Sequence, residues 1–144
     1  MNKVKIIECP RDAMQGIKSH FISTEAKAAY INSLLKVGFD TIDFGSFVSP
    51  KAIPQMRDTA AVLSKLDISQ TQSKLLAIIA NVRGANDAAQ FEEIDYLGYP
   101  FSISENFQMR NTHKTIHQSI EALEEILSIA IRTNKEVVAY LSMG

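Results

Sequence analysis

Arg11 and Asp12 are the residues of this sequence best suited to chemistry, because they place a fixed cation and a carboxylate side by side. They follow a short apolar run, residues 4–8, that is typical of a β-strand. A guanidinium stays protonated and pairs with planar oxygen groups, and a carboxylate can bind a divalent cation. The pattern favours chemistry on a carboxylate or a thioester, although an Arg-Asp dipeptide taken alone is more commonly a surface ion pair.

A second segment, residues 42–56, reads Ile-Asp-Phe-Gly-Ser-Phe-Val-Ser-Pro-Lys-Ala-Ile-Pro-Gln-Met. Together with Cys-Pro-Arg-Asp-Ala-Met-Gln at residues 9–15, it resembles hydroxymethylglutaryl-CoA (HMG-CoA) lyase, one of the DRE-TIM metallolyases. The Arg-Asp-x-x-Gln part alone would equally fit isopropylmalate, homocitrate or citramalate synthases, whereas the Ser-Phe-Val-Ser-Pro-Lys run favours the lyase. The resemblance extends along essentially the whole chain, to residues 140–144.

The resemblance implies a (β/α)8 barrel of which this chain supplies only a part. Such a barrel needs about 250 residues, and the chain has 144. We therefore expect an α/β fold, the N-terminal portion of a TIM barrel, with about five parallel strands and outer helices. It would form a single partial catalytic domain over residues 1–144, truncated at its C-terminus.

Short apolar runs alternate with helical patterns, as expected for successive β-α units. The predicted strands are residues 3–8, 41–45, 74–80, 93–97 and 136–141. A helix is predicted after Ser23, with others over residues 56–66 and 85–91. The last helix is indicated by a stripe of apolar residues at helical spacing: Ile116, Ile120, Leu123, Ile126, Leu127 and Ala130.

The reactive groups of such a barrel lie at the C-terminal ends of its strands, and the resemblance implies roles for three residues there. Asp12 would bind a divalent cation, Mg²⁺ or Mn²⁺, and Arg11 would stabilise the enolate oxygen that develops as the carbon–carbon bond breaks. Asp43 stands where the family has a glutamate that supports this catalytic arginine. Because Asp43 is one methylene shorter, we expect it to hold Arg11 through a water or a slightly moved backbone.

Six further residues are predicted to contact the substrate: Gln15, Lys18, Ser46, Asn81, Tyr140 and Ser142. Three of them have an ordinary structural alternative. Lys18 would be an exposed lysine without a role, Ser46 would bond its own backbone in a turn, and Asn81 would satisfy backbone groups of a loop. Cys9 is interpreted as buried filler rather than as a nucleophile.

The composition describes a soluble globular domain and names no partner. Lys and Arg number 15 against 16 Asp and Glu, without a long basic run, which argues against nucleic-acid binding. No apolar run approaches the roughly 18 residues that span a bilayer, and a single cysteine excludes an intrachain disulfide. We predict a cytoplasmic protein without a membrane partner.

The resemblance thus predicts a metal-dependent lyase that cleaves an acyl-CoA substrate, HMG-CoA, to acetyl-CoA and acetoacetate by a retro-Claisen reaction, in keeping with leucine degradation. The family's other metal ligands, a His-x-His pair and an Asn, are absent from this sequence. The isolated chain is therefore expected to be inactive, and to form a homo-oligomer or need the missing C-terminal half. Two alternatives stay open: a related Claisen-condensing acyltransferase, and a catalytically inactive half barrel that binds or assembles.

Overall fold

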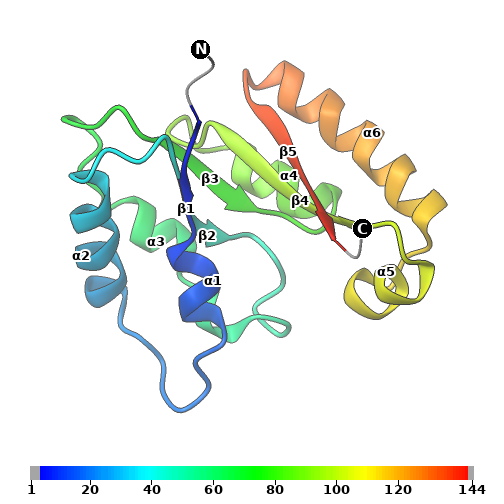
Figure 1. Ribbon diagram of the computed structural model, residues 1–144, viewed down its shortest axis with the longest axis horizontal. Coiled ribbons are helices and arrows are strands. Elements are labelled where there is room, and N and C mark those ends of the chain that lie inside the picture. The colour runs from blue at the N-terminus through cyan, green and yellow to red at the C-terminus, as the bar shows by residue number, and fades with distance from the viewer. Residues whose placement is uncertain (1–3, 143–144) are drawn as a thin grey trace. The chain divides into compact units, whose positions relative to one another are not determined.

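The computed structural model describes residues 4–142 of the chain. Within them strands and helices alternate, as the sequence predicts for successive β-α units (Figure 1). The elements are β1 (Ile7–Glu8), α1 (Pro10–Gln15), α2 (Thr24–Leu35), β2 (Thr41–Ser46), the 3-10 helix η1 (Pro54–Met56), α3 (Thr59–Leu63), β3 (Lys74–Ile78), α4 (Val82–Ala89), β4 (Tyr96–Ser102), α5 (Glu105–Thr112), α6 (Ile116–Arg132) and β5 (Glu136–Ser142).

The chain divides into two compact units, residues 1–76 and 77–144, and the boundary falls within β3. In the first unit β1 pairs in parallel with β2, with Ile7 opposite Thr41. In the second unit β4 pairs in parallel with β5 along its whole length. The strand order is β1-β2-β3-β4-β5, so each strand is hydrogen-bonded to its neighbour in sequence, as consecutive β-α units require.

The strand β2 is buried along its whole length. Side chains alternate between the two faces of a strand, so Ile42 and Phe44 together supply a buried apolar surface on one face of β2. Asp43 lies between these two and is 0% exposed. A carboxylate at such a position needs a cation and hydrogen-bond donors to offset its lost hydration, which makes the surroundings of Asp43 the feature to follow.

The helix α2 begins where the sequence predicts. The Ser23 hydroxyl accepts a hydrogen bond of 3.2 Å from the Ala26 N–H, which satisfies a donor that the first helical turn leaves unpaired. Ile31 and Leu35 are buried on one face of the helix. Gly38 then adopts a φ of 90° before β2, a conformation that glycine reaches without steric cost.

Two elements near the start of the chain differ from the prediction. β1 covers only Ile7–Glu8 of the predicted residues 3–8, of which residue 3 lies outside the described part. The apolar run begins before the paired stretch, and Val4, at its start, is 89% exposed. α1 is not predicted at all, and Pro10 occupies its first turn, where the fixed φ of proline suits a helix start.

The predicted helix over residues 56–66 is shorter, because α3 covers only Thr59–Leu63. Asp58 interrupts the helical pattern with a φ of −103°, and its side chain caps no backbone N–H of α3. The carboxylate of Asp58 instead binds Lys27 and Thr24 of α2. A contact between two segments distant in sequence thus decides where this helix begins.

In the second unit, β4 runs over Tyr96–Ser102 rather than over residues 93–97. Gly98 and Pro100 lie beyond the predicted end, and both pair with residues of β5. The carbonyl of Gly98 also accepts a hydrogen bond of 2.8 Å from the Ile79 N–H. Backbone pairing on the ladder therefore overrides the low strand preference of these two residues.

The helices of the second unit are set by side-chain caps. α4 begins at Val82, before the predicted residue 85, because the Asn81 carbonyl oxygen accepts from the Gly84 N–H at 2.9 Å. α5 was not predicted and is capped by Ser104, which accepts from the Phe107 N–H. No helix within residues 4–142 is long and apolar enough to cross a lipid bilayer.

The apolar stripe predicted for α6 is only partly the buried face. Ile126 and Ala130 are buried, but Ile120 and Leu127 are 46% and 42% exposed. The buried face instead includes the small residue Ser119, whose carbonyl accepts from the Tyr99 hydroxyl of β4 at 3.1 Å. The buried face of α6 is therefore offset from the predicted stripe, and it includes Ser119 and Ala122.

Candidate active site

Arg11 of α1 makes a direct, two-pronged ion pair with Asp43 of β2. Its Nε lies 3.1 Å from Asp43 Oδ1, and its Nη2 lies 2.5 Å from Asp43 Oδ2. Of the two expected ways for the shorter aspartate to hold Arg11, the bridging water is wrong, and the moved backbone stays a prediction. The unpredicted helix α1 explains the difference, because it follows β1 at once and packs against β2, which brings Arg11 within reach.

The electrostatics of Asp43 are set by its burial. Burial raises the pKa of Asp43 above its ordinary value, and the hydrogen bond and charge of Arg11 oppose this shift. Two parallel N–H donors are the strongest partners that a carboxylate finds in a protein. Asp43 therefore fixes the plane of the guanidinium, and Arg11 supplies the cation that makes a buried carboxylate tolerable.

Asp12 lies on the opposite, open side of Arg11. Arg11 Nη1 donates to Asp12 Oδ1 at 2.9 Å, and Gln15 Nε2 donates to the same oxygen at 2.8 Å. The Asp12 side chain is 65% exposed, whereas that of Asp43 is fully buried. The Arg11 guanidinium thus binds the buried Asp43 carboxylate and the exposed Asp12 carboxylate at the same time.

The donor chemistry of Asp12 fits a hard divalent cation, because a carboxylate oxygen is the ligand that Mg²⁺ and Mn²⁺ prefer. Both side-chain hydrogen bonds of Asp12 use Oδ1, and the side chain as a whole is 65% exposed. Within residues 4–142, no three His, Cys, Asp or Glu side chains gather as a metal-binding group. Asp12 would accordingly be one ligand of a set completed from elsewhere.

Cys9 stands directly before α1, beside these charges. Burial raises the pKa of its thiol above the ordinary value, and the nearby Asp43 carboxylate raises it further. The uncharged thiol is a poor nucleophile, and its Sγ lies 3.9 Å from the Ile7 carbonyl oxygen. Cys9 is only half-buried, so it is less enclosed than the interpretation as buried filler expected, and its lack of a nucleophilic role stays a prediction.

Gln15 and Lys18 lie on one cavity of about 510 Å³ in the first unit. Its walls come from the chain after α1 and from the chain around η1: residues 15–18, 20–21, 52–55 and 57. The Oε1 atom of Gln15 is buried and has no hydrogen-bond partner among the described residues. Lys18 is exposed at this cavity, and its contact with a substrate stays a prediction.

Ser46 ends β2 and is buried. Its Oγ accepts a hydrogen bond of 3.2 Å from the Val48 N–H, which is the turn contact considered as the alternative for this residue. Its backbone N–H donates to Thr59 Oγ1 at 3.0 Å. Ser46 thus shapes the turn after β2, and its role toward a substrate stays a prediction.

The other three predicted residues belong to the second unit. Asn81 caps α4 with its side-chain oxygen, which is the loop role considered for it. Tyr140 and Ser142 lie in β5, and Ser142 Oγ donates to the Phe101 carbonyl at 3.2 Å. Direct contacts therefore unite Arg11 with Asp12 and Asp43, and through Asp12 with Gln15.

No family model matches the sequence. Known relatives nevertheless match almost all of it. The mitochondrial HMG-CoA lyase of Macaca fascicularis is 35% identical over 143 residues, which cover 97% of this chain and 42% of that protein. The HMG-CoA lyase YngG of Bacillus subtilis is 33% identical over 141 residues, which cover 97% of this chain and 46% of that protein. The chain is a homologue of the N-terminal part of HMG-CoA lyases.

Solved HMG-CoA lyases confirm the fold class. The enzyme from Bacillus subtilis superimposes with a TM-score of 0.88 at 33% identity, over 96% of this chain and 46% of that one. The enzyme from Acinetobacter baumannii, in complex with coenzyme A and 3-methylmalate, gives 0.85 at 30% identity, over 95% and 44%. The five parallel strands and their helices match the N-terminal part of these lyase barrels. The chain thus spans less than half the length of these lyases.

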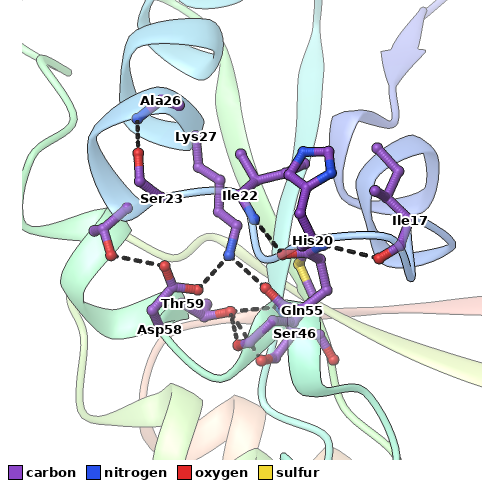
Figure 2. A network of polar contacts seen from close by, with 12 residues as sticks. Ile17, His20, Ile22, Ser23, Ala26, Lys27, Ser46, Gln55, Asp58 and Thr59 are labelled. Atoms are coloured by element: carbon purple, nitrogen blue, oxygen red, sulfur yellow. Dashed lines mark hydrogen bonds and ion pairs between the residues drawn. The ribbon is translucent and has the colours of Figure 1, made fainter.

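Three residues of this HMG-CoA lyase homologue form a polar cluster that the sequence patterns did not reveal: the buried Lys27 and Gln55 and the partly exposed Asp58, here called the Lys27 cluster. Lys27 Nζ donates to Asp58 Oδ1 at 2.6 Å and to the Gln55 carbonyl (Figure 2). Lys27 lies four residues before Ile31, on the apolar face of α2. A lysine at such a position signals a buried cation that needs a partner.

Proposed function

We propose that this chain supplies the N-terminal part of the active site of a metal-dependent carbon–carbon lyase that cleaves HMG-CoA, or a close relative, to acetyl-CoA and acetoacetate. One observation carries the proposal: Arg11 is locked to buried Asp43 while it also reaches exposed Asp12. Arg11 and Asp12 belong to α1, which follows the C-terminal end of β1. Barrels of this kind have their catalytic residues at these strand ends.

Arg11 stabilises the oxygen that becomes negative as the carbon–carbon bond breaks. Its guanidinium cannot lose its proton at neutral pH, and Asp43 holds it through Nε and Nη2. A donor that is already oriented needs no reorganisation when the charge develops, which is the main source of electrostatic catalysis. Asp43 acts here as a positioning residue, because its carboxylate is fully buried.

Asp12 holds the divalent cation, Mg²⁺ or Mn²⁺, with its carboxylate. When bound, such a cation polarises the hydroxyl and carbonyl oxygens of the substrate. Arg11 and Gln15 both donate to Asp12 Oδ1 and so orient the carboxylate, as partners behind a metal ligand commonly do. The remaining ligands come from the rest of the barrel, which this chain does not supply.

The substrate is an acyl-CoA. Lys18 and Gln15 would meet it at the cavity beside α1, and Ser46, Asn81, Tyr140 and Ser142 would contact it from the strand ends of their own units. A related lyase is seen in complex with coenzyme A. We further propose that the enzyme is cytoplasmic, serves leucine degradation, and is active once the remaining half of the barrel or a partner chain completes it.

A chimera tests the proposal. This chain replaces the matching N-terminal part of YngG, the relative that it matches over 46% of that protein, and acetoacetate release from HMG-CoA is measured with Mg²⁺. We expect turnover by the chimera, none by the chain alone, and a loss of about 10²–10³-fold in kcat for Arg11→Ala, the size found for removing one oxyanion donor.

A folded chimera that releases no acetoacetate, with intact YngG active in parallel, would refute the lyase proposal. The same protein is then tested for condensation of acetyl-CoA with 2-keto acids and for binding of coenzyme A. Condensation would identify an acyltransferase of the synthase type. Binding without turnover would identify a half barrel that retains ligand contacts alone.

A further inference from the structure

The segment between α1 and α2, residues 16–22, has no helix or strand of its own. One side chain fastens it. Gln55 Nε2 donates to the carbonyls of Ile17 and His20, at 2.9 and 3.0 Å. Gln55 Oε1 accepts from the Ile22 N–H at 2.9 Å (Figure 2). Gln55 is 5% exposed, so these bonds are sheltered from competing water.

Gln55 is in turn held by two charges. Lys27 Nζ donates to the Gln55 backbone carbonyl and to Asp58 Oδ1, and Asp58 Oδ2 accepts from the Thr24 hydroxyl at 2.8 Å. The Lys27 side chain is 2% exposed and that of Asp58 is 13% exposed. The Lys27 cluster therefore ties α2, η1 and residues 16–22 together (Figure 2).

The segment that Gln55 fastens is a wall of the 510 Å³ cavity. It carries Lys18 and Phe21, and the ring of Phe21 lies 4.0 Å from Lys27 Nζ and 3.7 Å from the Arg57 guanidinium. Arg57 also lines the cavity. The cavity wall thus combines cations with an aromatic ring, and its shape depends on contacts made behind it.

We propose that Lys27, Gln55 and Asp58 are positioning residues that form the cavity wall before an anionic acyl-CoA binds. The inference rests on the proposed function, because it assigns this cavity to the substrate of that reaction. A wall formed in advance removes the cost of ordering residues 16–22 during binding. Gln55 itself lines the cavity, and Lys27 and Asp58 hold it from behind, whereas the bond-breaking groups are Arg11 and Asp12. Loss of the Lys27 cluster therefore acts on KM and leaves kcat nearly unchanged.

The first measurement uses the chain itself and does not depend on activity. Gln55→Met keeps the length of the side chain and removes its three hydrogen bonds. Amide exchange should accelerate at least ~10-fold at Ile22, since local opening there no longer breaks a bond, with α2 and β2 unchanged. Gln70→Met, in the exposed loop before β3, is the matched control and should exchange as the wild type does. Unchanged exchange at Ile22 would overturn the proposal.

The second measurement uses the chimera with YngG. Gln55→Met should raise KM for HMG-CoA at least ~10-fold, with kcat within about threefold of the unmutated chimera, and Gln70→Met should change neither. A fall in kcat at constant KM would overturn the inference and leave the lyase standing. A folded but inactive unmutated chimera would refute the proposed function and this inference with it, whatever the exchange data show.

Lys27→Met alone leaves the Asp58 carboxylate without its cation and is prone to misfold. The double variant Lys27→Met/Asp58→Leu removes both charges and should keep the melting temperature near that of the wild type. It should show the KM increase of Gln55→Met, because the Gln55 carbonyl has lost its anchor. A double variant with normal stability and normal KM would show that the charges do not position the wall.

Discussion

The first unit contains two ion pairs that use similar groups but differ in how their remaining donors and acceptors are satisfied. In the Lys27–Asp58 pair, every partner belongs to the protein. The ammonium contacts the Asp58 carboxylate, a backbone carbonyl and an aromatic ring, and the second Asp58 oxygen accepts a hydrogen bond from a hydroxyl. Arg11 and Asp43 are closed on one side only. The guanidinium also reaches Asp12, whose side chain is 65% exposed.

The difference follows from the two cations. An ammonium is a compact charge with three donors, which three neighbours can satisfy, whereas a guanidinium carries five donors in a rigid fork. That fork can bind a buried carboxylate with one edge and present its other edge to an open site. The closed pair holds segments of the chain, and the open pair is arranged to meet a ligand.

Arg11→Met tests the contact between Arg11 and the buried Asp43, and it should have the largest effect on the free energy of unfolding. It leaves the Asp43 carboxylate, 0% exposed, without its cation. Breaking a buried pair in this way costs about 3–5 kcal/mol, measured as the free energy of unfolding in urea at neutral pH. The double variant Arg11→Met/Asp43→Leu should recover most of the loss. A single variant as stable as the wild type would show that water reaches Asp43 after all.

Asp43→Glu tests whether the short side chain suits this site. The glutamate would restore the residue of the resembling family, but Asp43 already lies 2.5 Å from Arg11 Nη2. An added methylene in a filled core costs about 1–3 kcal/mol, so we expect a lower melting temperature and lower kcat in the chimera. A more stable, more active variant would mean that Asp43 is too short in solution.

The sequence predicted that Asp43 would hold Arg11, but it did not predict that the contact would be direct. Arg11, Asp12 and Asp43 could be named from motifs because Arg11 and Asp12 follow one predicted strand and Asp43 lies within the next. The direct contact could not be predicted, since it depends on α1, a six-residue helix whose start is signalled only by Pro10. Whether one methylene fewer can be tolerated is decided by backbone placement, which no pattern encodes.

The same limit explains the errors in the fold. The cap Ser23 was predicted, although the equally local caps Asn81 and Ser104 were not. The start of α3 depends on Asp58, which binds a lysine 31 residues away in the sequence. Apolar periodicity predicts the buried face of α2 but assigns no role to Lys27, which lies on that face. Long-range polar contacts are what a local pattern omits.

At acid pH, the dependence of the unfolding free energy on pH should differ between Asp43 and an exposed carboxylate. Burial raises the pKa of Asp43 above 3.8, so between 3.8 and that higher pKa the folded state binds more protons than the unfolded one. The contribution of Asp43 is present below 3.8 and is lost as the pH rises through the folded pKa. Asp43→Asn should therefore make the slope of unfolding free energy against pH more positive above 3.8.

Asp67→Asn is the opposite control. Hydrogen bonds from the Ser69 hydroxyl and backbone lower the pKa of this exposed Asp67 below 3.8. Its contribution is present above 3.8 and is lost as the pH falls through the lower pKa. Its variant should make the slope less positive below 3.8 and leave the range above unchanged. Equal slope changes in both variants would contradict the assignment to Asp43.

Asp12→Asn should have the smallest effect on stability and the clearest effect on function. The side chain is 65% exposed, and exposed substitutions usually change unfolding free energy by less than about 0.5 kcal/mol. The amide still offers Arg11 an oxygen, but it lacks the charge that holds a divalent cation. Mn²⁺ binding by the chimera, followed by electron paramagnetic resonance, should weaken together with acetoacetate release.

Asp58→Asn is the matched control: it should lower the melting temperature and leave Mn²⁺ binding intact. Equal Mn²⁺ binding by Asp12→Asn and the wild type would remove Asp12 from the ligand set and leave the open side of Arg11 without a function.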